Sequence, residues 1–158
     1  MGEVRRIVLW LVSGKDYRSR KGSGKAVVFL KGVAIWGVII LAEVLHGTAR
    51  VLFLQPYVGD FRARQIAVFT GSGMILALAY ATVRWLGTTR RASLLGVGVL
   101  WLVLTLAFEL FLGRVLLGYS WQRIGSDYNL LAGGLLPFGL LVLTTAPLLA
   151  AKWRGILP

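Results

Sequence analysis

The chain has 158 residues, of which 57% are hydrophobic, and its formal net charge is +12. A mean hydropathy of +0.75 excludes an ordinary soluble domain of this size. The absence of cysteine excludes disulfides, iron–sulfur clusters and cysteine zinc sites. A single histidine, His46, excludes a bis-histidine haem within one chain.

The N-terminal 25 residues are basic and precede the apolar part of the chain. Glu3–Val12 combines two arginines with a short apolar run. This composition predicts an amphipathic segment on the membrane surface, and a disordered tail is the alternative. Ser13–Lys25 is polar and contains glycine, which is typical of a linker.

Four apolar stretches follow. A hydrocarbon core of ~30 Å needs ~20 apolar helical residues to cross it. The sequence therefore predicts an all-α, integral membrane four-helix bundle over residues 26–151, with a short tail at 152–158. The expected spans are Ala26–Leu54, Ile66–Leu86, Leu94–Leu117 and Leu130–Ala151.

Two local signals refine these spans. Pro56 is expected to end the first span, because proline lacks the backbone N–H that a helix interior requires. In the second span, Gly73, Ala77 and Ala81 are four residues apart. This small-residue stripe predicts close contact with another helix.

The basic residues are distributed unevenly. Thirteen of the 18 lysines and arginines fall on the side of the four-span arrangement that holds both termini. The positive-inside rule places that side, and both termini, in the cytoplasm. We interpret the basic surplus as a topology signal with attraction to anionic lipids at the cytoplasmic face, and not as a nucleic-acid surface.

The first span carries polar residues on one face. Glu43, His46, Gly47 and Arg50 have the spacing i, i+3, i+4 and i+7, which aligns them along a helix. An acid, an imidazole and a guanidinium would thus form one stripe, with a gap at Gly47.

A second polar stripe is expected on the third span, from Thr105 to Glu109. Arg114 comes five residues after Glu109, about 140° away around the helix, so it is a poor partner within that helix. A further tier of charges near the outer surface is expected from Asp60, Arg62, Arg64, Arg123 and Asp127.

A charge at the bilayer centre costs ~2.5–3.5 kcal/mol, so these side chains should face inward and pair. The expected pairs are Glu43 with Arg50, flanked by His46, and Glu109 with Arg114 or an arginine of the outer loops. Three interpretations stay open: ion pairs that only hold the bundle, a site for a ligand, lipid headgroup or proton, and a polar face completed by another subunit.

Neither a catalytic nor a metal motif is evident. The spacing of Glu43, His46 and Glu109 permits metal binding but matches no metal motif, so no metal or cofactor is expected. No Ser–His–acid arrangement is present, which disfavours hydrolysis.

The two halves of the chain share a pattern. Glu43 is followed four residues later by Gly47, and Glu109 by Gly113. In each half an arginine, a short aromatic outer loop and a return span come next. A tandem repeat of two helix hairpins and a chance similarity both account for this pattern.

The segment from Gly47 to Gly59 (GTARVLFLQPYVG), with Gly113-Arg114, Ser120-Trp121 and Asp127-Tyr128-Asn129, resembles small four-helix bacterial inner-membrane proteins with no assigned activity. The resemblance implies a multi-pass protein of the bacterial inner membrane and transfers no catalytic residues.

These observations favour a non-catalytic accessory or structural subunit of a larger membrane complex. Its partners would be other membrane subunits or further copies of the chain. The alternative is a small-molecule or lipid-binding transporter or membrane enzyme that uses the Glu/His/Arg cluster. The discriminating change is substitution of Glu43 or Glu109 by glutamine.

Overall fold

The structure is a computed structural model that describes the backbone of residues 2–157 and the side chains of residues 24–157. Within these residues every regular element is helical. In chain order the elements are α1 (Gly2–Ala49), η1 (Arg50–Leu54), α2 (Gln55–Val58), α3 (Asp60–Leu86), α4 (Arg91–Phe111), η2 (Leu112–Leu116), α5 (Trp121–Tyr128), η3 (Leu130–Ala132) and α6 (Leu136–Trp153).

Four helical stretches are long and apolar enough to cross a membrane, which confirms the prediction of an all-helical chain with four potential membrane spans. They are Gly24–Val58, Asp60–Leu86, Arg91–Leu116 and Leu136–Trp153.

The spans differ from their predicted bounds, and the second begins at Asp60 instead of Ile66 and the third at Arg91 instead of Leu94. Pro56 does not end the first span, because α2 follows η1 directly and continues the helix to Val58. The fourth span begins at Leu136 and not at Leu130. Leu130–Ala132 is a 3-10 turn that ends at Gly133, whose φ of 84° favours glycine.

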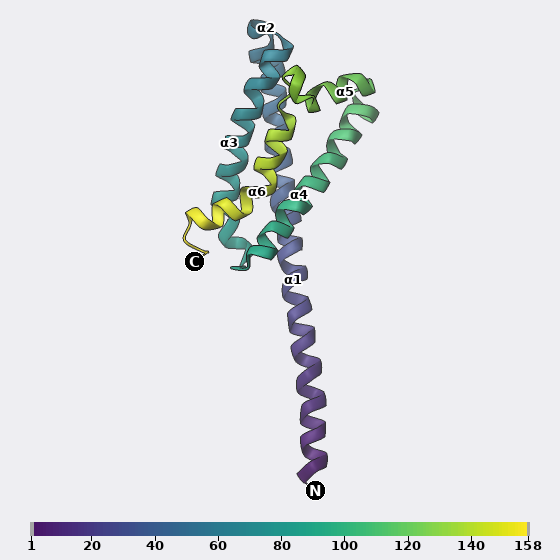
Figure 1. The fold of residues 1–158 in the computed structure, drawn as a ribbon, viewed down its shortest axis with the longest axis vertical. Coiled ribbons are helices and arrows are strands. Elements are labelled where there is room, and N and C mark those ends of the chain that lie inside the picture. The colour runs from purple at the N-terminus through teal and green to yellow at the C-terminus, as the bar shows by residue number, and fades with distance from the viewer. Residues whose placement is uncertain (1, 158) are drawn as a thin grey trace.

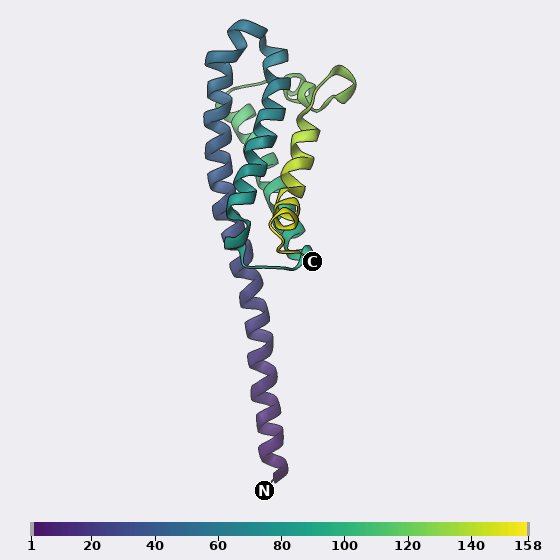
Figure 2. The same cartoon turned by 90° about the vertical axis from the view of Figure 1, so that its left-hand side faces the viewer.

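The segment expected to be a linker, Ser13–Lys25, is helical. It belongs to α1, which runs without a break from Gly2 to Ala49. Lysine and arginine are good helix formers and offset the cost of the few glycines. Figures 1 and 2 show α1 continuing past the other helices. The prediction that Glu3–Val12 is amphipathic concerns side chains outside the described ones.

Helices α1 and α6 each pack against both α3 and α4. The core between them contains Ile39, Val83, Trp101 and Leu143. Trp101 is fully buried, and its Nε1 donates a hydrogen bond of 2.8 Å to the carbonyl oxygen of Gly32. This bond satisfies the indole N–H and fixes α4 against α1.

Small residues allow close contact between α4 and α6. The small-residue stripe predicted on α3 does not take part in this contact. A Cβ atom at Gly98 would overlap the carbonyl oxygen of Thr144, so the two backbones touch at this point. Gly73, Ala77 and Ala81 are exposed instead, and the buried face of α3 carries Gly71, Ser72, Ile75, Ala79 and Val83.

The helices alternate in direction, so both chain ends lie on the same side as the turn between α3 and α4 (Figures 1 and 2). Helices α2 and α5 lie at the opposite side, called here the α5 end. Towards this end α4 leans away from α6, and α5 follows as a short segment across the top (Figure 1). The candidate site lies at this end, where α4 and α6 separate.

Candidate functional site

A cavity of about 720 Å³ occupies the α5 end, between α1, α3, α4 and α6. Its deeper walls are apolar and include Ile39, Ile75 and Leu143. Its polar lining includes most of the residues that the sequence singles out, together with others: Glu43, His46, Arg50, Arg64, Ser72, Thr105, Glu109, Asp127 and Tyr128.

On the α1 side, Glu43 and His46 form a pair one helical turn apart. His46 Nδ1 lies 3.5 Å from Glu43 Oε2, and His46 Nε2 lies 2.8 Å from the Thr70 hydroxyl on α3. Gly71 makes room for the carboxylate, because a Cβ atom there would be 3.0 Å from Glu43 Oε1. A glycine on α3 thus lets Glu43 lie between the two helices.

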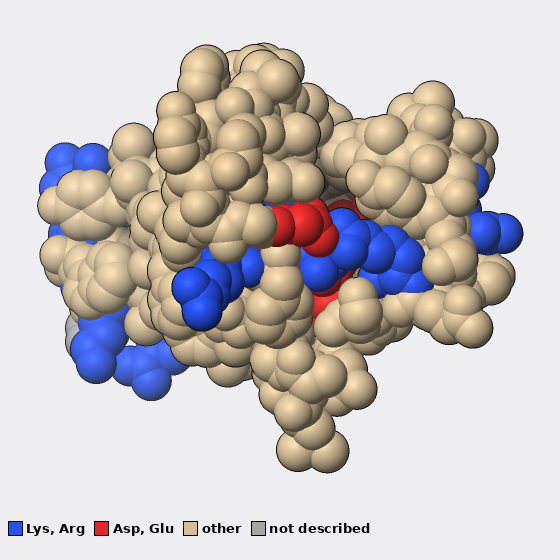
Figure 3. Space-filling view, turned by 90° about the horizontal axis from the view of Figure 1, so that it is seen from above, with Lys and Arg blue, Asp and Glu red and all other residues tan. Residues whose placement is uncertain are grey.

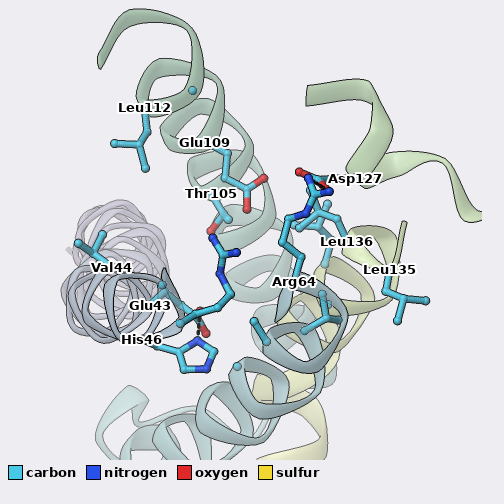
Figure 4. Close-up of a pocket in the computed structure, with 18 of the residues that line it drawn as sticks. Glu43, Val44, His46, Arg64, Thr105, Glu109, Leu112, Asp127, Leu135 and Leu136 are labelled. Atoms are coloured by element: carbon cyan, nitrogen blue, oxygen red, sulfur yellow. Dashed lines mark ion pairs between the residues drawn. The ribbon is translucent and has the colours of Figure 1, made fainter. Parts of the chain in front are cut away.

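On the α4 side, Thr105 and Glu109 face the same space (Figure 4). Trp36 Nε1 donates a hydrogen bond of 3.0 Å to Thr105 Oγ1. The Tyr128 hydroxyl donates a bond of 3.3 Å to Glu109 Oε2, which connects α4 to the last residue of α5. Figure 4 shows Thr105 and Glu109 across the cavity from Glu43.

Five charged residues form what we call the rim network, defined as Arg50, Asp60, Arg64, Arg123 and Asp127. Asp60 lies 2.8 Å from Arg123, 3.3 Å from Arg64 and 3.8 Å from Arg50. Arg64 also lies 2.8 Å from Asp127. Figure 3 looks onto this end and shows acidic and basic side chains side by side in a central hollow framed by uncharged surface.

Two groups contributed by α5 have raised pKa values. Burial raises the pKa of Asp127, and the nearby Arg64 and Arg123 oppose this shift. Burial also raises the pKa of Tyr128 to about 12, and the neighbouring Glu109 carboxylate adds to the shift. The Tyr128 phenol therefore remains a hydrogen-bond donor at neutral pH.

The structure assigns Arg50 a different partner from the one expected. Glu43 and Arg50 are two helical turns apart, about 10 Å along the axis. The Glu43 carboxylate turns to His46, whereas Arg50 reaches outward to Asp60 at the start of α3.

Four predicted site residues do not line the cavity: Asp60 and Arg123, which belong to the rim network, and Arg114 and Arg62. Arg114 is exposed; it donates a hydrogen bond of 2.6 Å to the carbonyl oxygen of Tyr119 and stacks over Trp121 at 4.8 Å. Glu109 accordingly pairs with Tyr128 and not with an arginine. Arg62 is exposed on α3 and also lies outside the cavity.

Ser72 is the main site residue that the sequence did not indicate. Its side chain lines the cavity and the residue is only 6% exposed, yet its Oγ has no hydrogen-bond partner among the described residues. Glu43 Oε1 is likewise buried and unpartnered. A lone serine in an apolar span gives no periodic signal.

Among the residues whose side chains are described, no group of three or more histidines, cysteines or acids is arranged to hold a metal ion. The arrangement offers hydrogen-bond acceptors and hydroxyls at its inner end and guanidinium groups at its rim. Comparisons with protein-family models, with curated proteins and with solved structures found no match for this chain.

Proposed function

We propose that this chain is a multi-pass membrane protein that binds an amphiphilic ligand in the cavity at the α5 end. One observation carries the proposal. Ser72 and Glu43 line the cavity, and Ser72 Oγ and Glu43 Oε1 are buried without a hydrogen-bond partner within the described residues. Buried polar groups are nearly always hydrogen-bonded in folded proteins. Groups that served only to hold the bundle are expected to satisfy one another's hydrogen bonds.

The position of the cavity favours a ligand that comes from the bilayer. Val44 on α1, Leu52 on η1 and Leu110 on α4 line the cavity and are also among the exposed apolar side chains. The cavity therefore reaches the outer surface of the bundle between α1 and α4. A hydrocarbon chain could leave the cavity there and remain in apolar surroundings.

The orientation is part of the proposal. With both termini in the cytoplasm, as the charge distribution supports, the α5 end faces the outer side of a bacterial inner membrane. The basic residues at the other end of the bundle would then meet anionic headgroups on the cytoplasmic face.

A matched pair of variants tests ligand binding. Gly47 and Gly37 both lie on α1, and a Cβ atom at either would have no neighbour within 4 Å. Gly47 lines the cavity and Gly37 does not. Gly47→Phe should fill the cavity and remove the copurifying ligand from native mass spectra in mild detergent, whereas Gly37→Phe should retain it. Equal retention by both variants would contradict the proposal.

The accessory-subunit role is a second candidate. It is favoured by the N-terminal part of α1, which continues beyond the bundle as a single helix (Figure 1). Such a helix offers a docking surface to other membrane subunits or to another copy of the chain. Affinity purification from native membranes should then retain partner proteins in fixed stoichiometry, and their loss on deletion of residues 1–23 would support this role.

A further inference from the structure

The charges around the cavity do not balance. The cavity and its rim bring together four carboxylates and three guanidinium groups. The guanidinium groups pair with Asp60 and Asp127. Glu43 and Glu109 have no arginine within ion-pair distance among the described side chains; their partners are His46 and Tyr128.

These two inner carboxylates therefore lack a full positive charge. His46 contacts only Oε2 of Glu43, which leaves Oε1 free. Ionised carboxylates inside a membrane are costly unless a cation accompanies them. A ligand that brings a positive charge to this point would remove that cost.

The free polar atoms specify which kind of cation fits. Glu43 Oε1 can only accept a hydrogen bond when ionised, and the buried Ser72 hydroxyl can accept one as well. Glu109 adds a second carboxylate across the cavity (Figure 4). A primary ammonium has three N–H donors, whereas a quaternary ammonium has none.

The rim supplies the complementary group. Arg50 Nη1 lies 3.8 Å from Asp60, beyond hydrogen-bond distance, and it is buried without a hydrogen-bond partner among the described residues. Arg64 Nε is also buried without a hydrogen-bond partner among the described residues. Both arginines line the cavity, so an anionic group on the ligand could accept hydrogen bonds from them.

We infer that the cavity binds a zwitterionic amphiphile, with a primary ammonium among Glu43, Glu109 and Ser72, an anionic group toward Arg50 and Arg64, and a hydrocarbon chain leaving between α1 and α4. Aminophospholipids and water-soluble phosphoethanolamine share this polar chemistry. The apolar walls and the lateral opening favour the lipid. This assignment rests on the proposed binding function and specifies its ligand class.

Lipid selectivity of the full chain tests the assignment. The protein, purified in maltoside micelles and stripped of lipid, is titrated with dioleoyl phosphatidylethanolamine, phosphatidylcholine or phosphatidylglycerol and followed by native mass spectrometry. Phosphatidylethanolamine should bind at least about tenfold more tightly than either of the others, because choline lacks N–H donors and glycerol lacks the cation. Equal binding of the three would overturn the assignment.

Variants test which residues produce the selectivity for phosphatidylethanolamine. Ser72→Ala and Glu43→Gln should each reduce phosphatidylethanolamine binding about tenfold, whereas Ser93→Ala and Arg62→Gln, which lie outside the cavity, should leave it unchanged. Ser72→Ala is the conservative test, since it removes one buried hydroxyl from a helix without adding volume. Unchanged binding in Ser72→Ala and Glu43→Gln would overturn the placement of the ammonium.

The remaining outcomes separate this assignment from the proposed function. Tight, Gly47→Phe-sensitive binding of phosphatidylglycerol alone would leave amphiphile binding intact and overturn the zwitterion. Failure of all three lipids to bind would overturn both. Calorimetric titration with phosphoethanolamine distinguishes the sources: affinity equal to that of the lipid would overturn the lipid source while supporting the polar chemistry.

Discussion

Arg64 Nη1 lies 2.8 Å from Asp127 Oδ1, so a side chain in the first turns of α3 holds the last turn of α5. Arg64 also lies 3.3 Å from Asp60 on its own helix. Arg64 therefore holds the segment that follows α4, which includes α5, in place across the cavity. The same segment carries Tyr128, which reaches Glu109 inside the cavity.

Arg64→Gln should loosen α5. Arg64 is largely buried, and loss of its ion pairs with Asp60 and Asp127 should cost about 1.5 kcal/mol or more. Hydrogen exchange of the α5 amides should then become roughly tenfold faster. Arg62→Gln on the same helix is the control, because Arg62 is exposed and lies outside the rim network. Equal exchange in both variants would mean that Arg64 does not hold α5.

The rim network illustrates what the sequence could predict and what it could not. Four of its five residues were expected near the outer surface, because charged residues in short loops flank the apolar spans, whereas Arg50 was expected in the first span as the partner of Glu43. Their partners were not predictable, since Arg64 and Asp127 meet only once α3 and α5 are placed in space. The helical spacing that suggested Glu43 with Arg50 describes one helix and contains no information about Asp60 on the next.

Gly98→Ala should destabilise the bundle. A Cβ atom at this position would overlap the carbonyl oxygen of Thr144, and backbone cannot move aside as a flexible side chain can. Overpacking of this kind typically costs ~1–3 kcal/mol, occasionally more. Thermal unfolding in detergent should show a lower midpoint. Gly73→Ala, where a Cβ would have no neighbour within 4 Å, should unfold like the wild type, and a similar midpoint for both variants would contradict this contact.

Tyr128 should ionise late in an alkaline titration. Its pKa of about 12 lies above the ordinary 10.0, so the folded state holds the phenol proton more tightly than the unfolded state does. The contribution of Tyr128 to stability is therefore fully present below pH 10.0 and is lost as the pH rises toward about 12. Tyrosinate absorbance should contain a component near pH 12 that Tyr128→Phe removes. Its persistence in that variant would assign it to another tyrosine.

Gly71→Ala should weaken ligand binding with little loss of stability. The added methyl would lie 3.0 Å from Glu43 Oε1, at the flexible end of a side chain, so the carboxylate can shift. The shift moves Glu43 away from its position in the cavity, and retention of the ligand in native mass spectra should fall several-fold. Gly73→Ala on the same helix is the matched control. Undiminished retention in Gly71→Ala would show that the position of Glu43 is unimportant.

The cavity itself could not be predicted from the sequence. Hydropathy predicts the four spans well, because apolar length is a local property, and it also locates Glu43 and Glu109 within them. The divergence of α4 and the exposure of Ser72 to the cavity depend on tertiary packing. Ser72 shares its buried face with Ile75 and Ala79, so its neighbours give it the pattern of an ordinary core position.

Photo-crosslinking tests the central claim, an amphiphile in the cavity, most directly. The protein would be reconstituted with a phosphatidylethanolamine that carries a diazirine near the start of one acyl chain, and the labelled residues mapped by mass spectrometry. Adducts should concentrate on Val44, Leu110 and Leu112, which line the cavity between α1 and α4, and Gly47→Phe should abolish them. Adducts spread evenly over outward-facing residues such as Leu41 and Val99, and unchanged by Gly47→Phe, would show that the lipid only surrounds the protein.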